Sequence, residues 1–235
     1  MSLTYSSFVT DLANLLVIGS TDANYLTVLP NIIDDSELRI YRDADFLRTI
    51  IRTSTMILST AARDVTLPNS VTFVVVESMN VYTPTGTSST RNPLTQVSRD
   101  FIDAVYPQET SSSSTAVPSY FAMITDQTAI VGPPAGSPYT LEVVGTTRPT
   151  VLSSGNSSTY LTQYFPDLFL AAACVYGNAY LKNFGASADD PKASMSWENH
   201  YGDLLRAVQA EENRKKSQGP AWQPKSQGPD TPQRV

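Results

Sequence analysis

The feature that most constrains the fold is a change of sequence texture along the chain. Short segments rich in Val, Ile, Thr and Tyr, separated by turn residues, fill residues 52–150, a pattern typical of β-strands. The residues on both sides have apolar side chains at helical spacing. Helical segments that flank an inserted domain must meet in space, because each has to bury its apolar face. The sequence therefore predicts an α+β fold.

In this fold a helical bundle, made of two N-terminal and two C-terminal helices, carries an inserted small antiparallel β domain and an extended C-terminal tail. We expect the first half of the bundle in residues 1–51, the β domain with one short helix in 52–158, the second half of the bundle in 159–213 and an extended docking tail in 214–235.

Turn residues divide the expected β domain. Residues 60–64 and 125–129 are typical of hairpin connections, and residues 83–93 of an exposed loop. Ser98 is expected to cap the one short helix, which ends before a proline. Its inward-facing residues are predicted to be Phe101, Ile102 and Val105.

The N-terminal part of the bundle is predicted to contain two helices. Thr4 or Ser6 can cap the first helix. The second helix has an apolar face of Leu29, Ile32, Ile33, Ser36 and Ile40 and a solvent side of Asp34, Asp35, Glu37, Arg39 and Arg42. Proline lacks a backbone N–H, so we expect Pro30 in the first turn of this helix.

The C-terminal part of the bundle is predicted to contain a buried helix and a long last helix. Pro166 begins the buried helix, whose apolar residues surround it on nearly all sides, and Gly185 ends it. Asp189 or Asp190 is expected to cap the last helix. The predicted bundle core comprises Leu29, Ile33, Leu168, Tyr180, Trp197, Tyr201 and Leu205.

The last 22 residues are rich in Pro, Gly, Gln and Ser, which bury too little apolar surface to fold alone. Every lysine of the chain lies at or after Lys182. The segment from Arg214 has five basic residues and one acidic residue, Asp230. A basic end on an acidic body is typical of a docking arm. The alternative is a solubilising tail without a partner.

The sequence has little that could support catalysis. His200 is the only histidine, and we interpret it as a half-buried structural residue. Cys174, the only cysteine, is expected to be a small core residue. The pair Asp43 and Asp45 could hold Mg²⁺ only with further oxygen ligands. We therefore predict that the chain is not an enzyme and has no catalytic, metal or cofactor-binding residues.

Charge and apolar runs also restrict the class of protein. The formal net charge of −6 argues against a protein that grips phosphates. No basic residue precedes the first apolar run, so the N-terminus is not expected to be a signal peptide. The longest apolar run is too short to cross a bilayer. We expect a soluble protein of a reducing cytoplasm, with no membrane partner.

Four segments of this sequence carry a resemblance to a known family. They are LPNIIDDSELRIYRD (29–43), LTQVSRDFIDAVYP (94–107), YLTQYFPDLFLAAACVYGNAYLKNF (160–184) and WENHYGDLLRAVQAEENRKK (197–216). They resemble the head-to-tail adaptor (connector) proteins of tailed bacteriophages, and are similar to tail tubular A-type adaptors. The resemblance extends over residues 4–216. Two departures are Phe165, where the family has a polar residue before the proline, and Ser36 in place of alanine.

This resemblance implies a homo-oligomeric ring, usually of 12 copies, at the virion neck, assembled in the host cytoplasm. The ring would bind the portal protein through the C-terminal tail and a tail nozzle or tube protein through the β domain. DNA would pass through its lumen without specific binding. The implied portal-docking residues are Arg214, Lys215, Lys216, Trp222 and Lys225.

Two alternatives remain open at this point. Within the structural class, the chain could be a tail-completion or other neck protein on the tail side. From a different class, it could be a carbohydrate-binding or hydrolase module built on the β domain. The second alternative predicts a pocket with convergent polar groups.

Overall fold

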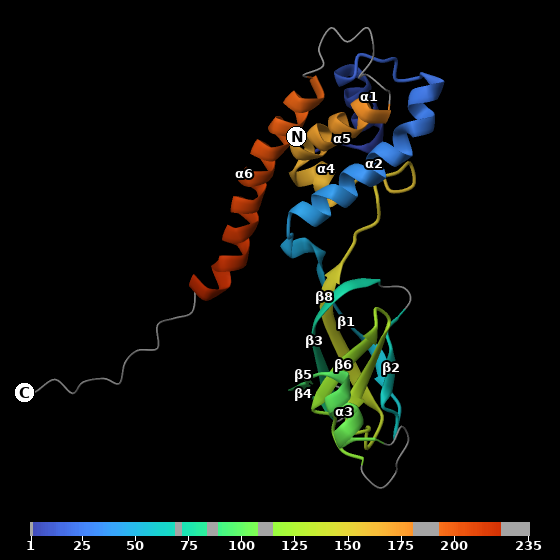
Figure 1. Ribbon diagram of the computed structural model, residues 1–235, viewed down its shortest axis with the longest axis vertical. Coiled ribbons are helices and arrows are strands. Elements are labelled where there is room, and N and C mark those ends of the chain that lie inside the picture. The colour runs from blue at the N-terminus through green and yellow to red at the C-terminus, as the bar shows by residue number, and fades with distance from the viewer. Residues whose placement is uncertain (1, 69–71, 84–88, 108–114, 181–192, 222–235) are drawn as a thin grey trace, which may run out of the picture. The chain divides into compact units, whose positions relative to one another are not determined.

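The computed structural model describes residues 2–68, 72–83, 89–107, 115–180 and 193–221 (Figure 1). The chain forms two compact units. The helical unit comprises Met1–Leu47 and Thr150–Val235, and the β unit comprises Arg48–Pro149. Residues 150–158, which we expected in the β domain, therefore belong to the helical unit, where Leu152 is part of the core.

The described residues of the helical unit form five helices. They are α1 (Tyr5–Leu15), α2 (Ala23–Asp43), α4 (Tyr160–Tyr164), α5 (Pro166–Tyr180) and α6 (Ala193–Ala221). Thr4 caps α1, as predicted, because its side chain accepts a hydrogen bond from the Ser7 N–H. Asp22 caps α2, so Pro30 is the eighth residue of this helix, and its predicted place in the first turn is wrong.

Helix α5 forms the centre of the helical unit and packs against α1, α2, α4 and α6 (Figure 1). The Phe8 and Phe169 rings stack with centroids 4.4 Å apart. Gly177 lets α1 approach closely, because a Cβ at this position would lie 2.7 Å from a Leu16 methyl carbon.

Most of the predicted bundle core is found in the core. Leu29, Ile33, Leu168 and Tyr201 are buried, while Trp197 and Leu205 are partly buried and pack against them. Tyr180 is a correction: its side chain is 38% exposed, and its hydroxyl donates a hydrogen bond to Asp35 at 2.5 Å.

The β unit contains two four-stranded sheets. Sheet A has the order β1 (Ile50–Leu58), β8 (Tyr139–Thr147), β3 (Phe73–Thr83), β4 (Thr90–Pro93). Sheet B has the order β2 (Asp64–Thr66), β7 (Thr128–Gly132), β6 (Tyr120–Thr125), β5 (Thr95–Gln96). The short 3₁₀ helix η1 (Leu47–Thr49) precedes β1. Every pair of neighbouring strands is antiparallel except β5–β6, which is parallel.

Apolar residues of both sheets meet in one core, so the two sheets form a sandwich. Leu141 and Val143 of sheet A are fully buried there with Ala129 and Val131 of sheet B. On the outer face of sheet B lies helix α3 (Arg99–Val105), whose Ile102 packs against the sheet residues Ala122 and Ile130.

Several local predictions for the β unit need correction. The 125–129 hairpin is confirmed, but residues 60–64 join β1 to β2, which lie in different sheets. The expected loop 83–93 contains β4. Ser98 caps α3 as predicted, yet Phe101 and Val105 are 40% and 48% exposed rather than inward-facing.

The expected start of an extended segment at residue 214 is wrong. Helix α6 continues to Ala221, so residues 214–221 are helical. Residues 222–235 lie outside the described residues, as do the expected helix end at Gly185 and the expected cap at Asp189 or Asp190. None of the helices in the described part of the chain is long and apolar enough to cross a membrane.

Candidate interaction sites

The C-terminal half of α6 is fastened to the helical unit by a buried carboxylate. Glu212 is only 2% exposed. One carboxylate oxygen accepts a hydrogen bond from the Leu47 N–H at 3.0 Å, and the other accepts from the Tyr160 hydroxyl at 3.1 Å. The Lys215 ammonium lies 2.7 Å from the second oxygen. Burial alone would raise the pKa of Glu212, but these bonds outweigh it and the pKa lies below its usual value.

The two adjacent lysines of the predicted docking set are engaged within the chain. Lys215 binds Glu211 as well as Glu212, each at 2.7 Å, and its ammonium lies 5.2 Å from the Phe165 ring centroid. Lys216 forms an ion pair with Asp45. The Lys215 pairs lie within α6, whereas the Lys216–Asp45 pair holds the C-terminal part of α6 against the segment that leaves α2.

Arg214 differs from these lysines. It is exposed, and within the described residues it forms no ion pair. Trp222 and Lys225, the other two predicted docking residues, lie outside the described residues.

A line of polar contacts along α6 joins this helix to α2 and to the segment that follows α2. The Arg39 guanidinium pairs with Glu198 and lies 4.2 Å over the Tyr201 ring. The Tyr201 hydroxyl donates to Asp43 at 2.8 Å, and Gln209 donates to the Asp43 backbone carbonyl at 2.7 Å. We call these contacts, with Glu212–Leu47 and Lys216–Asp45, the α2–α6 seam.

The seam also bears on the magnesium hypothesis. The Asp43 carboxylate accepts from Tyr201 and pairs with Arg39 at 3.5 Å. The carboxylate of Asp45 is bound by Lys216. Within the described residues no three His, Cys, Asp or Glu side chains gather as metal ligands. Asp43 and Asp45 therefore act here as acceptors for the side chains that hold α6.

A second buried carboxylate, Glu37 of α2, corrects the prediction that this residue faces solvent. Glu37 is 2% exposed, and one of its oxygens accepts a hydrogen bond from the Leu152 N–H at 3.2 Å. Its other oxygen has no partner within the described residues. Burial raises the pKa of Glu37 to about 7, and the nearby Asp34 adds to this effect.

The backbone groups that bind the two buried glutamates lie just before and just after the β unit in the chain. Leu47 is the last residue before the β unit, and Leu152 is the third residue after it. Each backbone N–H donates to a buried glutamate of the helical unit, Glu212 or Glu37. The helical unit thus fixes both segments that connect it to the β unit.

A third buried carboxylate lies in sheet A of the β unit. Glu142 of β8 is fully buried although it lies on the outer face of the sheet. It pairs with Arg52 of β1 and Arg91 of β4, and accepts hydrogen bonds from Tyr82 at 2.6 Å and Asn80 at 3.1 Å, both on β3. Burial acts to raise the pKa of Glu142, but the bonds from Tyr82, Arg91 and Arg52 hold it below its usual value.

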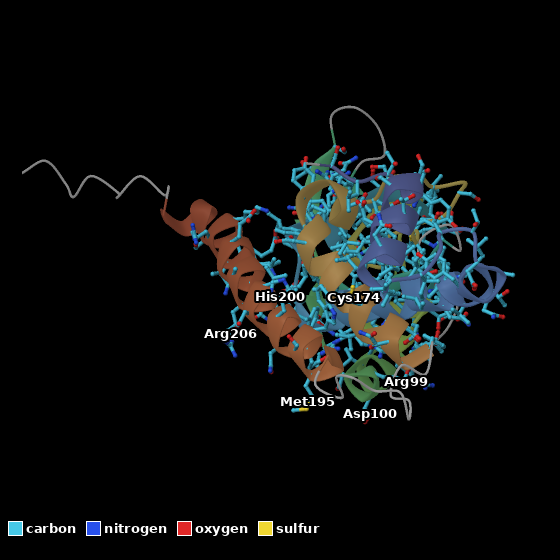
Figure 2. All side chains as sticks on the ribbon, turned by 90° about the horizontal axis from the view of Figure 1, so that it is seen from above. Arg99, Asp100, Cys174, Met195, His200 and Arg206 are labelled. Carbon is cyan, nitrogen blue, oxygen red and sulfur yellow. The ribbon has the colours of Figure 1, made fainter. Side chains whose placement is uncertain are left out.

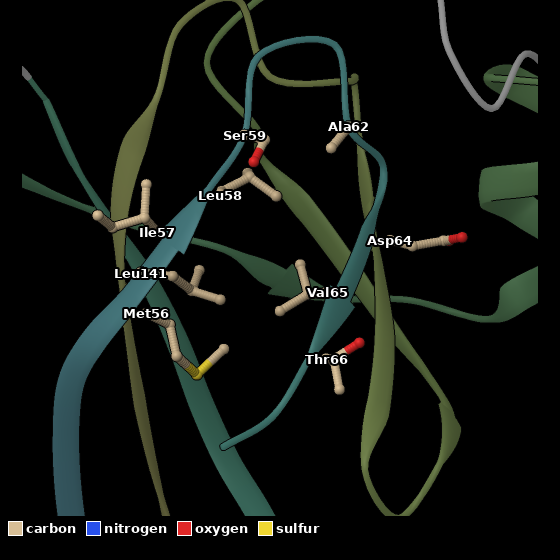
Figure 3. A pocket seen from close by; sticks show the side chains of 9 residues that line it. All are labelled: Met56, Ile57, Leu58, Ser59, Ala62, Asp64, Val65, Thr66 and Leu141. Atoms are coloured by element: carbon tan, nitrogen blue, oxygen red, sulfur yellow. The ribbon is translucent and has the colours of Figure 1, made fainter. Parts of the chain in front are cut away.

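The pocket in Figure 3 lies between the edge strands β1 and β2 and measures about 190 Å³. Met56, Leu58, Val65 and Leu141 point into it, whereas Asp64 points away. A site for a sugar or a hydrolysed substrate needs polar groups that converge on the ligand. The four side chains just named are apolar, and the charged residue of the lining, Asp64, points away, so the lining lacks such an arrangement.

The surroundings of His200 and Cys174 can be compared with the roles predicted for them. His200 is exposed rather than half-buried, and its ring packs edge-on against Trp197 at 5.9 Å (Figure 2). Cys174 is fully buried in α5 as predicted, and burial raises the pKa of its thiol to about 12. A thiol in this environment stays protonated and unreactive at neutral pH.

Comparison with known proteins identifies one family. The family model described as SU10 adaptor protein matches residues 3–225, which include the whole β unit and the whole of α6. No curated protein matches the chain.

Proposed function

The chain belongs to the SU10 adaptor protein family, a family of phage adaptors, and on this premise we propose that it forms a ring between portal and tail at the virion neck. The ring lines the exit channel for DNA. The family match over residues 3–225 is the observation that carries this proposal, because it includes every helix and strand of the described residues. The resemblance of the four segments quoted above to head-to-tail adaptors agrees with it.

The portal-binding element in this proposal is the C-terminal segment. Its base is rigid, since the α2–α6 seam fixes α6 as far as Lys216. Arg214 is exposed and available for an acidic group of the portal. Trp222 supplies an apolar anchor and Lys225 a second cation. Lys215 and Lys216 support this segment through their intrachain pairs.

The tail side of the ring is assigned to the β unit, which would contact a nozzle or tube protein. The lumen is assigned to the passage of DNA without specific binding. Each copy has a formal charge of −6, so a ring of 12 copies has about −72. Such a charge repels phosphates, as a conduit for DNA requires.

The portal-docking role can be tested with a chain that ends at Ala221. We expect this chain to fold, because α6 and the seam remain intact, and to lose at least tenfold in affinity for purified portal rings. Co-sedimentation with portal rings measures the effect. Arg206→Ala, at an exposed arginine on the solvent side of α6 (Figure 2), is the matched control and should bind like the native chain. Unchanged binding by the shortened chain would refute the docking role.

A further inference from the structure

The two outer faces of the β sandwich are covered differently. On the outer face of sheet B lies α3, which contacts β6 and β7. No described element of the β unit packs on the outer face of sheet A. A sheet face of this kind is usually covered by another layer when it has apolar side chains. We call the outer face around Arg52, Ile57, Tyr82, Arg91, Thr140 and Glu142 the open face.

Strand register places the members of the open face next to one another. Ile57 is opposite Thr140, Thr140 is opposite Tyr82, and Tyr82 is opposite Arg91, so these four residues form one row across the sheet. Glu142 is in the adjacent row of the same face, and Arg52, opposite Val144, is in the row beyond it. The two arginines therefore approach Glu142 from opposite directions along the strands.

Glu142 fixes both arginines while leaving them accessible. Their side chains are 60% and 52% exposed, although each is paired with this fully buried carboxylate. Each guanidinium has five N–H donors and uses only some of them here. The centres of protein interfaces are often rich in arginine and aromatic side chains. An arginine that is already held in place also loses less conformational entropy on binding. Ile57 supplies that aliphatic group at 71% exposure.

The same chain has a complementary surface on α3. Phe101 and Val105, one turn apart, are both partly exposed, and Asp100 beside them is exposed (Figure 2). Asp103 is bound by Arg63 and Arg99, whereas Asp100 forms no ion pair within the described residues. This helix thus presents two apolar side chains and one unpaired carboxylate.

We propose that α3 of one copy packs onto the open face of sheet A of the next copy, with Asp100 facing Arg52 and Arg91, and with Phe101 and Val105 against Ile57. This inference rests on the ring proposed above and names a contact between its β units. Two different surfaces of each copy take part, so the contact is heterologous and propagates from copy to copy, as a closed ring requires. Sheet A would then be covered by a helix, as sheet B already is.

Two surface variants test this contact by assembly. The first variant, Ile57→Lys, should prevent α3 from packing on the open face. The second variant combines Asp100→Lys and Val105→Lys and should prevent α3 from packing on its neighbour. All three positions are exposed, so the variants should fold. We expect each variant alone to remain monomeric by mass photometry, and their equimolar mixture to form one-to-one dimers, because only one intact contact exists per pair. Ile124→Lys and Asp126→Lys, on the β6–β7 hairpin, are the matched controls and should assemble like the native chain.

A cross-link tests the contact independently of ring formation. Chains with Ile57→Cys, mixed with chains with Val105→Cys and oxidised mildly, should form an intermolecular disulfide, and Asp126→Cys in place of Val105→Cys should not. Rings without this cross-link, or rings formed by either lysine variant, would overturn the contact while the ring stands. A cross-link without rings would overturn the ring alone. The absence of both would overturn both.

Discussion

Val17 has a φ of 57°, a left-handed backbone conformation that β-branched residues rarely adopt. It follows the end of α1, where its N–H bonds to the Asn14 carbonyl and the next N–H, of Ile18, bonds to the Ala13 carbonyl. This is the Schellman pattern, whose left-handed position is usually glycine. The Val17 side chain is 90% exposed, so it buries little apolar surface that could offset the steric cost of its left-handed backbone conformation.

Val17→Gly should therefore raise the free energy of unfolding by about 1 kcal/mol, because glycine removes the steric cost of this conformation. Urea unfolding followed by circular dichroism measures the difference. Val17→Ala is the control: it keeps a Cβ and should change stability by less than about half as much. A destabilised glycine variant would show that the Val17 side chain contributes to the fold.

Glu37 makes stability depend on pH. Its pKa is raised by burial from 4.5 to about 7, so the folded chain holds this proton more tightly than the unfolded chain. Its contribution is fully present below pH 4.5 and is lost as the pH rises to about 7. Over this range the loss is about 3 kcal/mol at most.

Glu37→Gln, which mimics the protonated carboxyl, should match the native chain in stability at pH 4.5. At pH 8 it should be the more stable of the two by about 2 kcal/mol. Urea unfolding at both pH values tests this, with Glu211→Gln, at an exposed position, as the control. Equal stability of the Glu37 variant and the native chain at pH 8 would contradict the raised pKa.

At the scale of elements, α6 is held by a polar seam as much as by apolar packing. Glu212 is the central residue of its C-terminal half, since it joins α6 to Leu47 and Tyr160 and also binds Lys215 of the same helix. Glu212→Ala should lower the free energy of unfolding by about 2 kcal/mol, because it leaves the partly buried Leu47 N–H and Lys215 ammonium with fewer partners. Thermal unfolding measures this loss.

Glu211→Ala is the matched control for Glu212→Ala. Glu211 binds the same lysine at the same 2.7 Å, but its side chain is 51% exposed. An exposed ion pair contributes about 0.5 kcal/mol. If both variants lost the same stability, the buried acceptor role of Glu212 would be refuted.

Local signals in the sequence were sufficient to predict several elements. Thr4 and Ser98 cap the helices that they were expected to cap, and the 125–129 hairpin forms. These features depend on residues close in sequence, where capping and turn chemistry act directly. The buried α5 was predictable because apolar residues surround it.

Long-range features were not predictable in this way. Glu37, Glu142 and Glu212 are buried because distant partners satisfy them, and nothing beside them in the sequence indicates those partners. Residues 60–64 have turn composition, but composition does not say that the two strands belong to different sheets. Phe101 and Val105 fit an inward-facing pattern, yet only Ile102 of this short helix reaches the sheet core.

At the scale of the whole molecule, the central claim is that many copies assemble into one ring beneath a portal. Family membership establishes an adaptor, and the ring is our proposal for its assembly. The seam supports the segment that would reach the portal, and α3 with the open face would join neighbouring copies.

Cryo-electron microscopy of the protein bound to purified portal rings tests this claim most directly. The account predicts class averages with a ring of about 12 subunits on the tail-facing side of the portal, around an open channel. A chain that remains monomeric at high concentration and leaves portal rings undecorated would contradict it.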